Sequence, residues 1–159
     1  MLVLALSGCS SDSTSTAPFL ANATTFDVQQ AMISTLQDEY RAADVYEAVI
    51  ATFGNVLPFS NILRAERQHA ASIEALFTVR GLAVPSRERA PTLPTLASVA
   101  EACDLGATAE VDNVGLYDRM LGMTLPADVR RVFEANRRAS LENHLPAFTR
   151  CGPVVLGVR

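Results

Sequence analysis

The stretch from Phe26 to Phe53 contains neither Gly nor Pro, and its apolar residues recur at helical spacing. The repeating positions are Met32, Leu36, Ala43, Tyr46, Ile50 and Phe53. Residues three, four or seven positions apart share one helix face, so this pattern predicts a long helix that ends before Gly54. The chain is 49% hydrophobic but only 6% aromatic and lacks Trp. Its Ala, Leu and Val must therefore provide most of the packing, which favours helices over a sheet.

Three further helices are predicted at residues 60–80, 95–120 and 124 to about 148. Ser60 is a favourable N-cap, and Gly81 and Gly122 follow the ends of the second and third helices. Residues 82–94 contain three prolines and predict a long connection. The predicted fold class is therefore all-α: a ferritin-like four-helix bundle over residues 26–151, with two antiparallel hairpins joined by a crossover. An up-down-up-down bundle remains open at this point.

The first and third predicted helices share a pattern of Glu and Tyr. Glu39 precedes Tyr46 by seven residues, and Glu110 precedes Tyr117 by the same interval. Seven residues are about two helical turns, so each Glu and its Tyr lie on one face. A tyrosine at this distance can donate its hydroxyl to a metal-ligating carboxylate and orient it.

The chain has 2 histidines, one on each of the other two predicted helices. Glu66 lies three residues before His69, which puts both side chains on one face. A carboxylate-bridged dimetal centre takes one Glu from each of two helices and a Glu-x-x-His pair from each of the others. The predicted metal ligands are Glu39, Glu66, His69, Glu110 and His144, with Glu66 the best candidate to bridge two ions. Such oxygen and imidazole ligands suit iron or manganese, with zinc as a substitute.

One position departs from the complete dimetal pattern. Leu141 stands three residues before His144, where a second bridging Glu belongs. Glu142 is expected to face away, and Ser140 is expected on the ligand side but is a poor ligand. A single-metal site and a dinuclear site are therefore both open. So is a decayed site in which protonated, hydrogen-bonded carboxylates form a polar core.

Several motifs resemble a known superfamily. The segment from Glu39 to Tyr46 is similar to the first-helix motif of the rubrerythrin and ferritin group, and ERQH is similar to the second. DVY, PFSNI, ERQH and ENHLPAF resemble, in order, a bacterial and archaeal ferritin-like family classed as domain of unknown function number 2202. The resemblance covers roughly residues 35–150. It implies a ferritin-like bundle and metal binding, without an established activity.

The N-terminus resembles a bacterial lipoprotein signal. An apolar run leads to LSGC, a lipobox-like motif in which Cys9 would carry lipid after cleavage. Residues 10–25 follow as a Ser/Thr-rich tether, and residues 152–159 form a C-terminal tail. Ser10 after the Cys favours the outer membrane or cell surface over the inner membrane. An apolar N-terminus with an incidental Cys is the alternative.

The two other cysteines are expected to pair. Cys103 lies seven residues before Glu110, and Cys151 lies seven residues after His144. On antiparallel helices both would lie at the same end of the bundle, close enough for a disulfide, which persists outside the cytoplasm. Two free thiols are the alternative.

These patterns support several functions. The leading hypothesis is an extracytoplasmic, lipid-anchored protein that binds one or two iron or manganese ions in the bundle. If it is an enzyme, the expected chemistry is oxidation of ferrous iron or reduction of peroxide. The alternatives are metal sequestration without turnover, and a non-catalytic envelope bundle with a vestigial site. The net charge of −4 and the absence of a basic run give no footprint for nucleic acid. A homo-oligomer is possible, and no protein partner is indicated.

Overall fold

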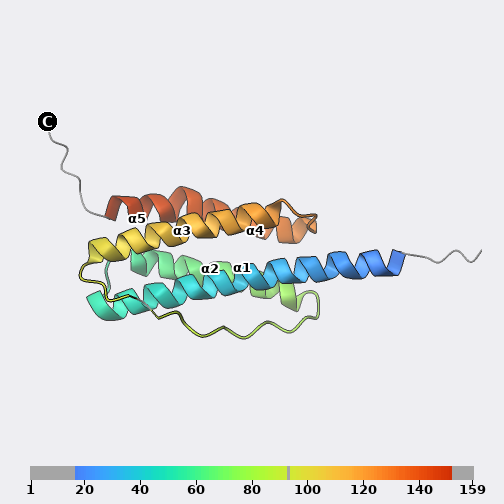
Figure 1. Cartoon of the computed structure of the whole chain (residues 1–159), viewed down its shortest axis with the longest axis horizontal. Helices are drawn as coiled ribbons and strands as arrows, with labels where there is room; N and C mark the ends of the chain where they lie inside the picture. Colours follow the sequence, from blue (N-terminus) through green and yellow to red (C-terminus); the bar gives the residue numbers. More distant parts are fainter. Residues whose placement is uncertain (1–16, 93, 152–159) are drawn as a thin grey trace, which may run out of the picture.

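A computed structural model describes residues 17–92 and 94–151, which form an all-α bundle without a strand (Figure 1). The elements are α1 (Ala17–Phe53), α2 (Phe59–Thr78), α3 (Val99–Leu121), α4 (Ala127–Ala139), the π-helical segment η1 (Ser140–His144) and α5 (Leu145–Cys151). Because α4, η1 and α5 follow one another without a break, they form one long fourth helix. The predicted all-α bundle is confirmed.

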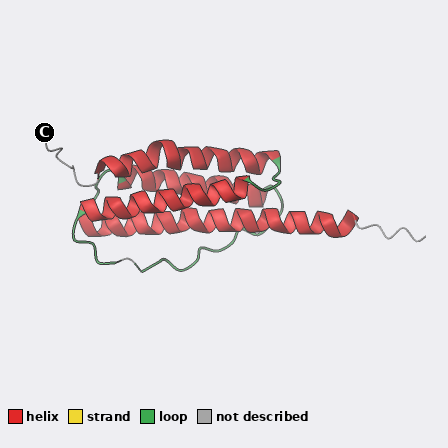
Figure 2. Ribbon diagram, turned by 45° about the horizontal axis from the view of Figure 1, so that its top comes forward, coloured by secondary structure: helices red, strands yellow, loops and turns green. Residues whose placement is uncertain are grey.

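The helices pair as two antiparallel hairpins, α1 with α2 and α3 with α4–α5 (Figures 1 and 2). The connection between the hairpins, residues 79–98, runs back along the bundle, so that α2 and α3 begin at the same end. In an up-down-up-down bundle α3 would begin where α2 ends. The expected crossover is therefore present.

Side chains of α1 hold this connection against the bundle. The amide of Gln37 donates to the carbonyl of Ser86 at 2.9 Å and accepts from the backbone N–H of Glu88 at 3.0 Å. Arg87 pairs with Asp44 at 2.5 Å. Neighbouring side chains thus satisfy part of the backbone of this connection, which lies outside the helices.

Helix α1 is longer than the sequence pattern predicts. It begins at Ala17, so the second part of the expected tether is helical, and its first turns project beyond the other helices (Figure 1). Pro18 lies in the first turn, where a missing N–H costs no helical hydrogen bond. The helix ends as expected at Gly54, whose φ of 84° is a left-handed conformation that glycine tolerates.

Helix α3 begins later than expected because of a cap that the sequence analysis missed. The Ser98 hydroxyl accepts the backbone N–H of Glu101 at 3.2 Å, and the Glu101 carboxylate accepts the backbone N–H of Ala97 at 2.8 Å. This reciprocal arrangement resembles a capping box and fixes the first turn at Val99.

The apolar core is divided into two clusters. One contains Met32, Leu36, Ile73, Phe77 and Phe133, and the other contains Tyr46, Phe59, Cys103 and Phe148. Along each of the four helices, the chain passes from one cluster to the other through a short buried polar stretch. These polar stretches therefore form a layer inside the bundle, enclosed by apolar side chains on both sides.

The fourth helix contains a π turn in that polar layer. The backbone N–H of Leu145 bonds to the carbonyl of Ser140, five residues earlier. Pro146 follows directly and lacks an N–H, and in a regular α-helix its ring would meet the carbonyl four residues back. The wider turn gives the backbone room before the proline, which explains its position.

A disulfide joins Cys103 near the start of α3 to Cys151 at the end of α5, as predicted. Its partners are 48 residues apart. Closing a loop of that length in the unfolded chain contributes about 4 kcal/mol of stability on the chain-entropy model. The bond thus fastens the two ends of the second hairpin.

No helix among the described residues is both long and apolar enough to cross a membrane. The expected lipobox with Cys9, the first part of the tether and the expected tail lie outside the described residues.

Candidate metal centre

Side chains from all four helices of the bundle meet in the polar layer. They are Glu39 from α1, Glu66 and His69 from α2, Glu110 from α3 and His144 from η1. The three glutamates expose only 0%, 1% and 2% of their surface, respectively. Burying three carboxylates together is costly unless cations or protons balance them. The structure thus brings together every residue that the sequence predicted as a metal ligand.

The five side chains form two similar halves around Glu66. In one half, His69 Nδ1 lies 3.0 Å from Glu66 Oε2 and 3.4 Å from Glu39 Oε2. In the other, His144 Nδ1 lies 2.9 Å from Glu66 Oε1 and 3.4 Å from Glu110 Oε2. Glu66 therefore turns one carboxylate oxygen toward each imidazole. The two rings stack with centroids 5.3 Å apart.

Two tyrosines cross between the halves. Tyr46 of α1 donates its hydroxyl to Glu110 Oε1 of α3 at 2.7 Å, and Tyr117 of α3 donates to Glu39 Oε1 of α1 at 2.5 Å. Each tyrosine thus holds the glutamate of the opposite helix and leaves the second oxygen of that carboxylate toward an imidazole. The predicted contact of both tyrosines with candidate ligands is present.

Several buried atoms at the centre have no hydrogen-bond partner. They include Glu39 Oε2, Glu66 Oε1 and His144 Nδ1. Glu66 Oε1 and His144 Nδ1 are close, but their relative direction is not that of a hydrogen bond. Buried polar atoms without partners cost about 1–3 kcal/mol each. One ligand atom each from Glu66, His69 and His144 lies within 4.8 Å of the others, so this group could hold a metal ion.

The carboxylates and imidazoles strongly perturb one another. Burial raises the pKa of Glu39 to about 7, and the charge of Glu66 acts in the same direction. Burial by itself would lower the pKa of the His69 imidazole, but Glu39 and Glu66 raise it to about 10. At His144, burial likewise lowers the pKa of the imidazole, but Glu110 and Glu66 raise it to about 9. At neutral pH the neighbouring carboxylates therefore keep both imidazoles protonated.

The pKa of Glu66 moves in the opposite direction. Burial alone would raise it, but the imidazoles of His144 and His69 outweigh burial, and the pKa of Glu66 is lowered. Glu66 is thus an ionised carboxylate between two cationic rings. A metal ion competes with the imidazole protons for the same nitrogen atoms.

The π turn changes which residue of the fourth helix points into the bundle. Leu141 is 38% exposed and does not point into the centre, whereas Ser140 is fully buried and its hydroxyl has no hydrogen-bond partner. Ser140 is on the ligand side, as expected, whereas Leu141 does not occupy the place of the second bridging Glu; the sequence analysis put it there by assuming α-helical geometry. A π turn advances each residue by a smaller angle, so the residue four before His144 takes that face.

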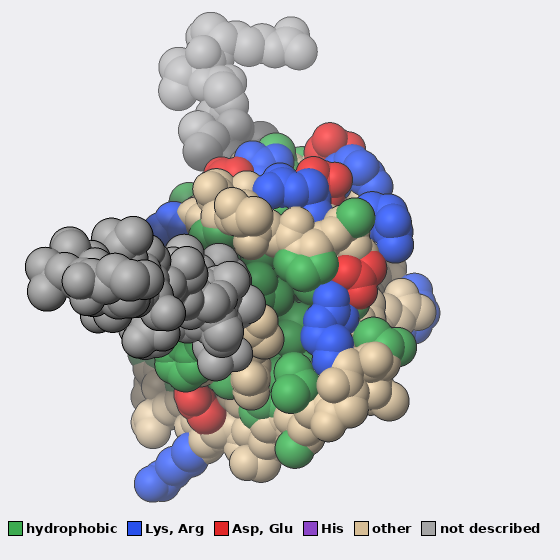
Figure 3. Space-filling model, turned by 90° about the vertical axis from the view of Figure 1, so that its right-hand side faces the viewer, with side chains coloured by type: hydrophobic (Ala, Val, Ile, Leu, Met, Phe, Trp, Pro, Cys, Tyr) green, Lys and Arg blue, Asp and Glu red, His purple; other side chains and the backbone are tan. Residues whose placement is uncertain are grey.

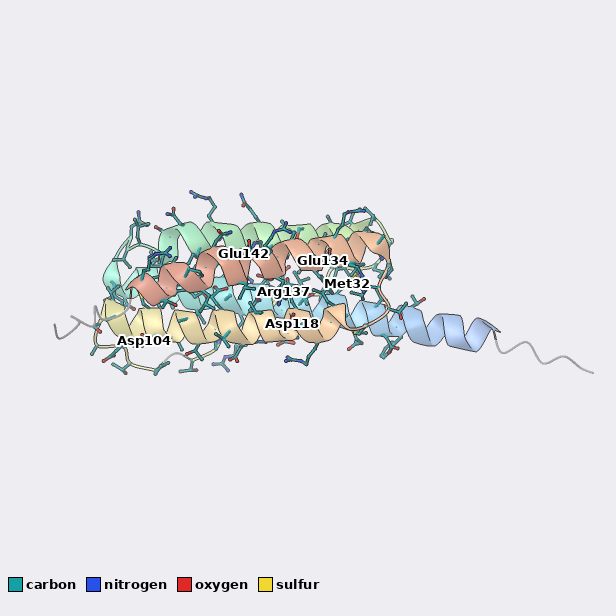
Figure 4. The ribbon with its side chains drawn as sticks, turned by 90° about the horizontal axis from the view of Figure 1, so that it is seen from above. Met32, Asp104, Asp118, Glu134, Arg137 and Glu142 are labelled. Carbon is teal, nitrogen blue, oxygen red and sulfur yellow. A yellow bond between two sulfur atoms is a disulfide. The ribbon has the colours of Figure 1, made fainter. Side chains whose placement is uncertain are left out.

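The fourth helix also carries charged residues on its surface. Glu142 is exposed, as expected. Figure 4 labels it on the fourth helix, where Arg137 forms an ion pair of 2.6 Å with Asp118 of α3. The ion pair of Arg137 with Asp118 joins α3 and the fourth helix at the surface and is separate from the centre.

Sequence reasoning missed two buried asparagines near the centre. Asn136 Nδ2 lies 3.1 Å from the Tyr117 hydroxyl and 3.4 Å from the Ser72 hydroxyl. Asn113 donates to Asp38 at 2.9 Å. Neither belongs to a spacing motif. The only available signal was a polar residue on the apolar side of its helix.

A separate hollow of the described part lies away from the centre. It has a volume of about 640 Å³ and lies at the end of the bundle beside Val28, Met32, Leu82, Leu125 and Pro126. Figure 3 shows hydrophobic side chains gathered at that end. Since the hollow is mainly apolar and contains none of the five converging side chains, we place the candidate chemistry in the polar layer.

Comparison with known proteins supports the fold alone. No family model matches the chain, and no curated protein matches it. A conserved hypothetical protein from Mycobacterium tuberculosis is similar, with a TM-score of 0.67 and 19% identity over 78% of this chain and 96% of that chain. A hypothetical protein from Methanococcus jannaschii has a TM-score of 0.67 and 21% identity over 76% and 77% of the two chains.

Proposed function

We propose that the chain is a ferritin-like protein, related to family number 2202, that binds iron or manganese in the polar layer of its bundle. The observation that carries this proposal is the orientation of Glu66, which turns one oxygen toward each imidazole at 3.0 and 2.9 Å. Burial of three carboxylates around this group, with unpartnered oxygens facing inward, favours cations at the centre. Carboxylate and imidazole ligands suit iron and manganese and also accept zinc.

The two halves would hold two ions. Glu39 and His69 would hold one, Glu110 and His144 would hold the other, and Glu66 would serve both. Three carboxylates balance three of the four positive charges of two divalent ions. Ser140 supplies no charge where a fourth carboxylate would stand, so we expect weaker binding in one half or a site that takes one ion.

Bound iron or manganese would supply one-electron redox chemistry, and we propose oxidation of ferrous iron or reduction of peroxide as the reaction. The chain's own residues prepare the site. Tyr46 and Tyr117 hold two carboxylates in orientation, which limits their movement when charge at the centre changes. The apolar clusters on both sides keep bulk water out and strengthen electrostatic interactions inside.

Metal content per chain tests the proposal. The purified protein is supplied with iron and manganese, and bound metal is measured by mass spectrometry. We expect one or two equivalents, lost in His69→Ala and His144→Ala. Glu142→Ala is the matched control, because Glu142 lies close to His144 in the chain but is exposed. Substoichiometric metal that is insensitive to both histidine substitutions would instead favour a polar core without a metal function.

Stoichiometric metal without turnover would favour sequestration, the second candidate function. The buried Ser140, in place of a fourth carboxylate, is the observation that favours it. Ferrous oxidation and peroxide consumption by the loaded protein distinguish these outcomes.

We also propose that the protein is attached to the outside of a bacterial membrane through lipid on Cys9. The lipobox-like motif LSGC supports this proposal, and the disulfide is consistent with an oxidising compartment. Metabolic labelling with an alkyne fatty acid tests it. Labelling of the full chain, but not of Cys9→Ala, is the expected result.

A further inference from the structure

A small cavity between α1 and α3 approaches the candidate metal centre from the side. Its volume is about 150 Å³, enough for several water molecules. Glu66 and Glu110 line it on the inside, and Asp38, Arg41 and Asp112 line it nearer the surface. Arg41 and Asp112 are exposed, whereas both glutamates are buried. The cavity therefore connects exposed charged groups with two of the candidate ligands.

Asn113, which lines this cavity, has a buried side-chain oxygen without a hydrogen-bond partner. Its side chain is only 5% exposed, and its Nδ2 donates to Asp38 Oδ2 at 2.9 Å. Because an ionised carboxylate only accepts hydrogen bonds, this contact uses the amide nitrogen and leaves Oδ1 available for another partner. That Oδ1 is buried without a partner. A carbonyl oxygen beside a carboxylate suits a hard divalent cation.

Arg41 provides a cation at the same place. Its Nη1 lies 2.7 Å from Asp38 Oδ1, and its side chain is 53% exposed. Because the guanidinium is exposed to water on one side, an incoming divalent cation can displace it from Asp38.

We propose that this cavity is the route by which divalent metal ions enter the centre, with Asp38 and Asn113 Oδ1 as a transient binding site. This inference rests on the proposed metal function. Asp112 attracts the ion at the mouth, and Arg41 is displaced from Asp38 as the ion arrives. The ion then passes to Glu110 and Glu66, whose Oε1 is also without a hydrogen-bond partner.

The rate of metal loading tests the route separately from the final site. The chain contains 3 tyrosines and no Trp, so tyrosine emission reports on the centre that Tyr46 and Tyr117 contact. Metal-stripped protein is mixed with excess Mn²⁺ in a stopped-flow instrument, and quenching of that emission is followed. Bound Mn²⁺ at equilibrium is measured on the same samples by mass spectrometry.

We expect Asp38→Asn to load about tenfold more slowly, because Arg41 then faces the mouth unpaired. Arg41→Gln should load faster, and both variants should reach the wild-type stoichiometry. The wild-type rate should fall with ionic strength more steeply than that of Asp38→Asn. Asp104→Asn is the matched control, since Asp104 is an exposed acid of α3 that does not line the cavity (Figure 4).

The outcomes separate the route from the function. Wild-type stoichiometry together with unchanged loading rates in Asp38→Asn and Arg41→Gln would overturn the entry route and leave the metal site standing. A wild type that takes up no Mn²⁺, iron or other divalent metal at Glu66, His69 and His144 would overturn both.

Discussion

Metal binding should release protons from the two histidines, in a number that the structure predicts. The carboxylates raise the pKa of His69 to about 10 and that of His144 to about 9. At pH 7.5 both imidazoles are therefore almost fully protonated, and Nδ1 of each faces the carboxylates. A metal ligand must be neutral imidazole, so filling both halves displaces one proton from each ring, about two in total.

The pH dependence of affinity follows from this count. Two released protons change the combined binding constant by about a hundredfold for each pH unit, which is about 2.7 kcal/mol. The affinity should rise with pH up to about 9, where His144 begins to lose its proton without metal. Above about 10 the dependence should level off. Glu39, whose pKa is raised to about 7, adds a fraction of a proton near neutrality.

Isothermal titration calorimetry measures the proton number directly. Mn²⁺ is titrated into stripped protein at pH 7.5 in buffers with different ionisation enthalpies, and the slope of apparent enthalpy against ionisation enthalpy gives the protons released. We expect about two protons when both imidazoles are ligands and about one when only one of them is. Full loading with no proton release would refute the reasoning, because the histidine nitrogens would then not be the ligands. Glu142→Gln, at an exposed position, should behave as the wild type.

Three further predictions concern stability and register. The raised pKa values of His69 and His144 stabilise the metal-free protein, and this contribution is complete below about pH 6.5. It is lost as the pH rises through about 9 and about 10. Urea titrations should therefore show that the free energy of unfolding falls by at least about 1.4 kcal/mol over that window. Gly106→Ala should destabilise the protein by about 1–3 kcal/mol, because the added Cβ would lie 2.8 Å from the buried Phe148 ring. Gly115→Ala would have no contact below 3.6 Å and should stabilise the protein by about 0.5–1 kcal/mol. Thermal unfolding of both variants and the wild type measures these effects. Ser140→Glu should destabilise the metal-free protein in urea and strengthen its metal binding, because the new carboxylate would be buried at the centre. Leu141→Glu should change the stability and the metal-binding free energy by no more than about 0.5 kcal/mol each. Equal effects at both positions would contradict the π-turn register.

The helical repeats and the spacing of polar residues predicted most of the centre. In any α-helix, residues three positions apart lie on one face, and in the structure Glu66 and His69 do so and are in contact. The seven-residue intervals likewise put Cys103 and Cys151 at one end of the second hairpin. Which residues of a regular helix share a face depends only on local backbone geometry, so it can be predicted from the sequence.

Relations that depend on irregular backbone or on contacts between helices could not be predicted in this way. A π turn before Pro146 exchanged Leu141 for Ser140 at the centre, since a one-residue change in the turn rotates every preceding side chain. The contact of Asn113 with Asp38 joins residues 75 positions apart. Such contacts arise only after two helices have packed.

From the sequence alone, the protein was determined to be a helical bundle in which carboxylates and histidines lie on the inner faces. Tertiary structure decided how these groups pair: Tyr46 holds Glu110, Tyr117 holds Glu39, and Glu66 lies between the imidazoles. The physical reason is one of range. Helical periodicity fixes the direction of a side chain within its own helix, whereas distances between helices depend on the packing of the apolar clusters on both sides of the polar layer.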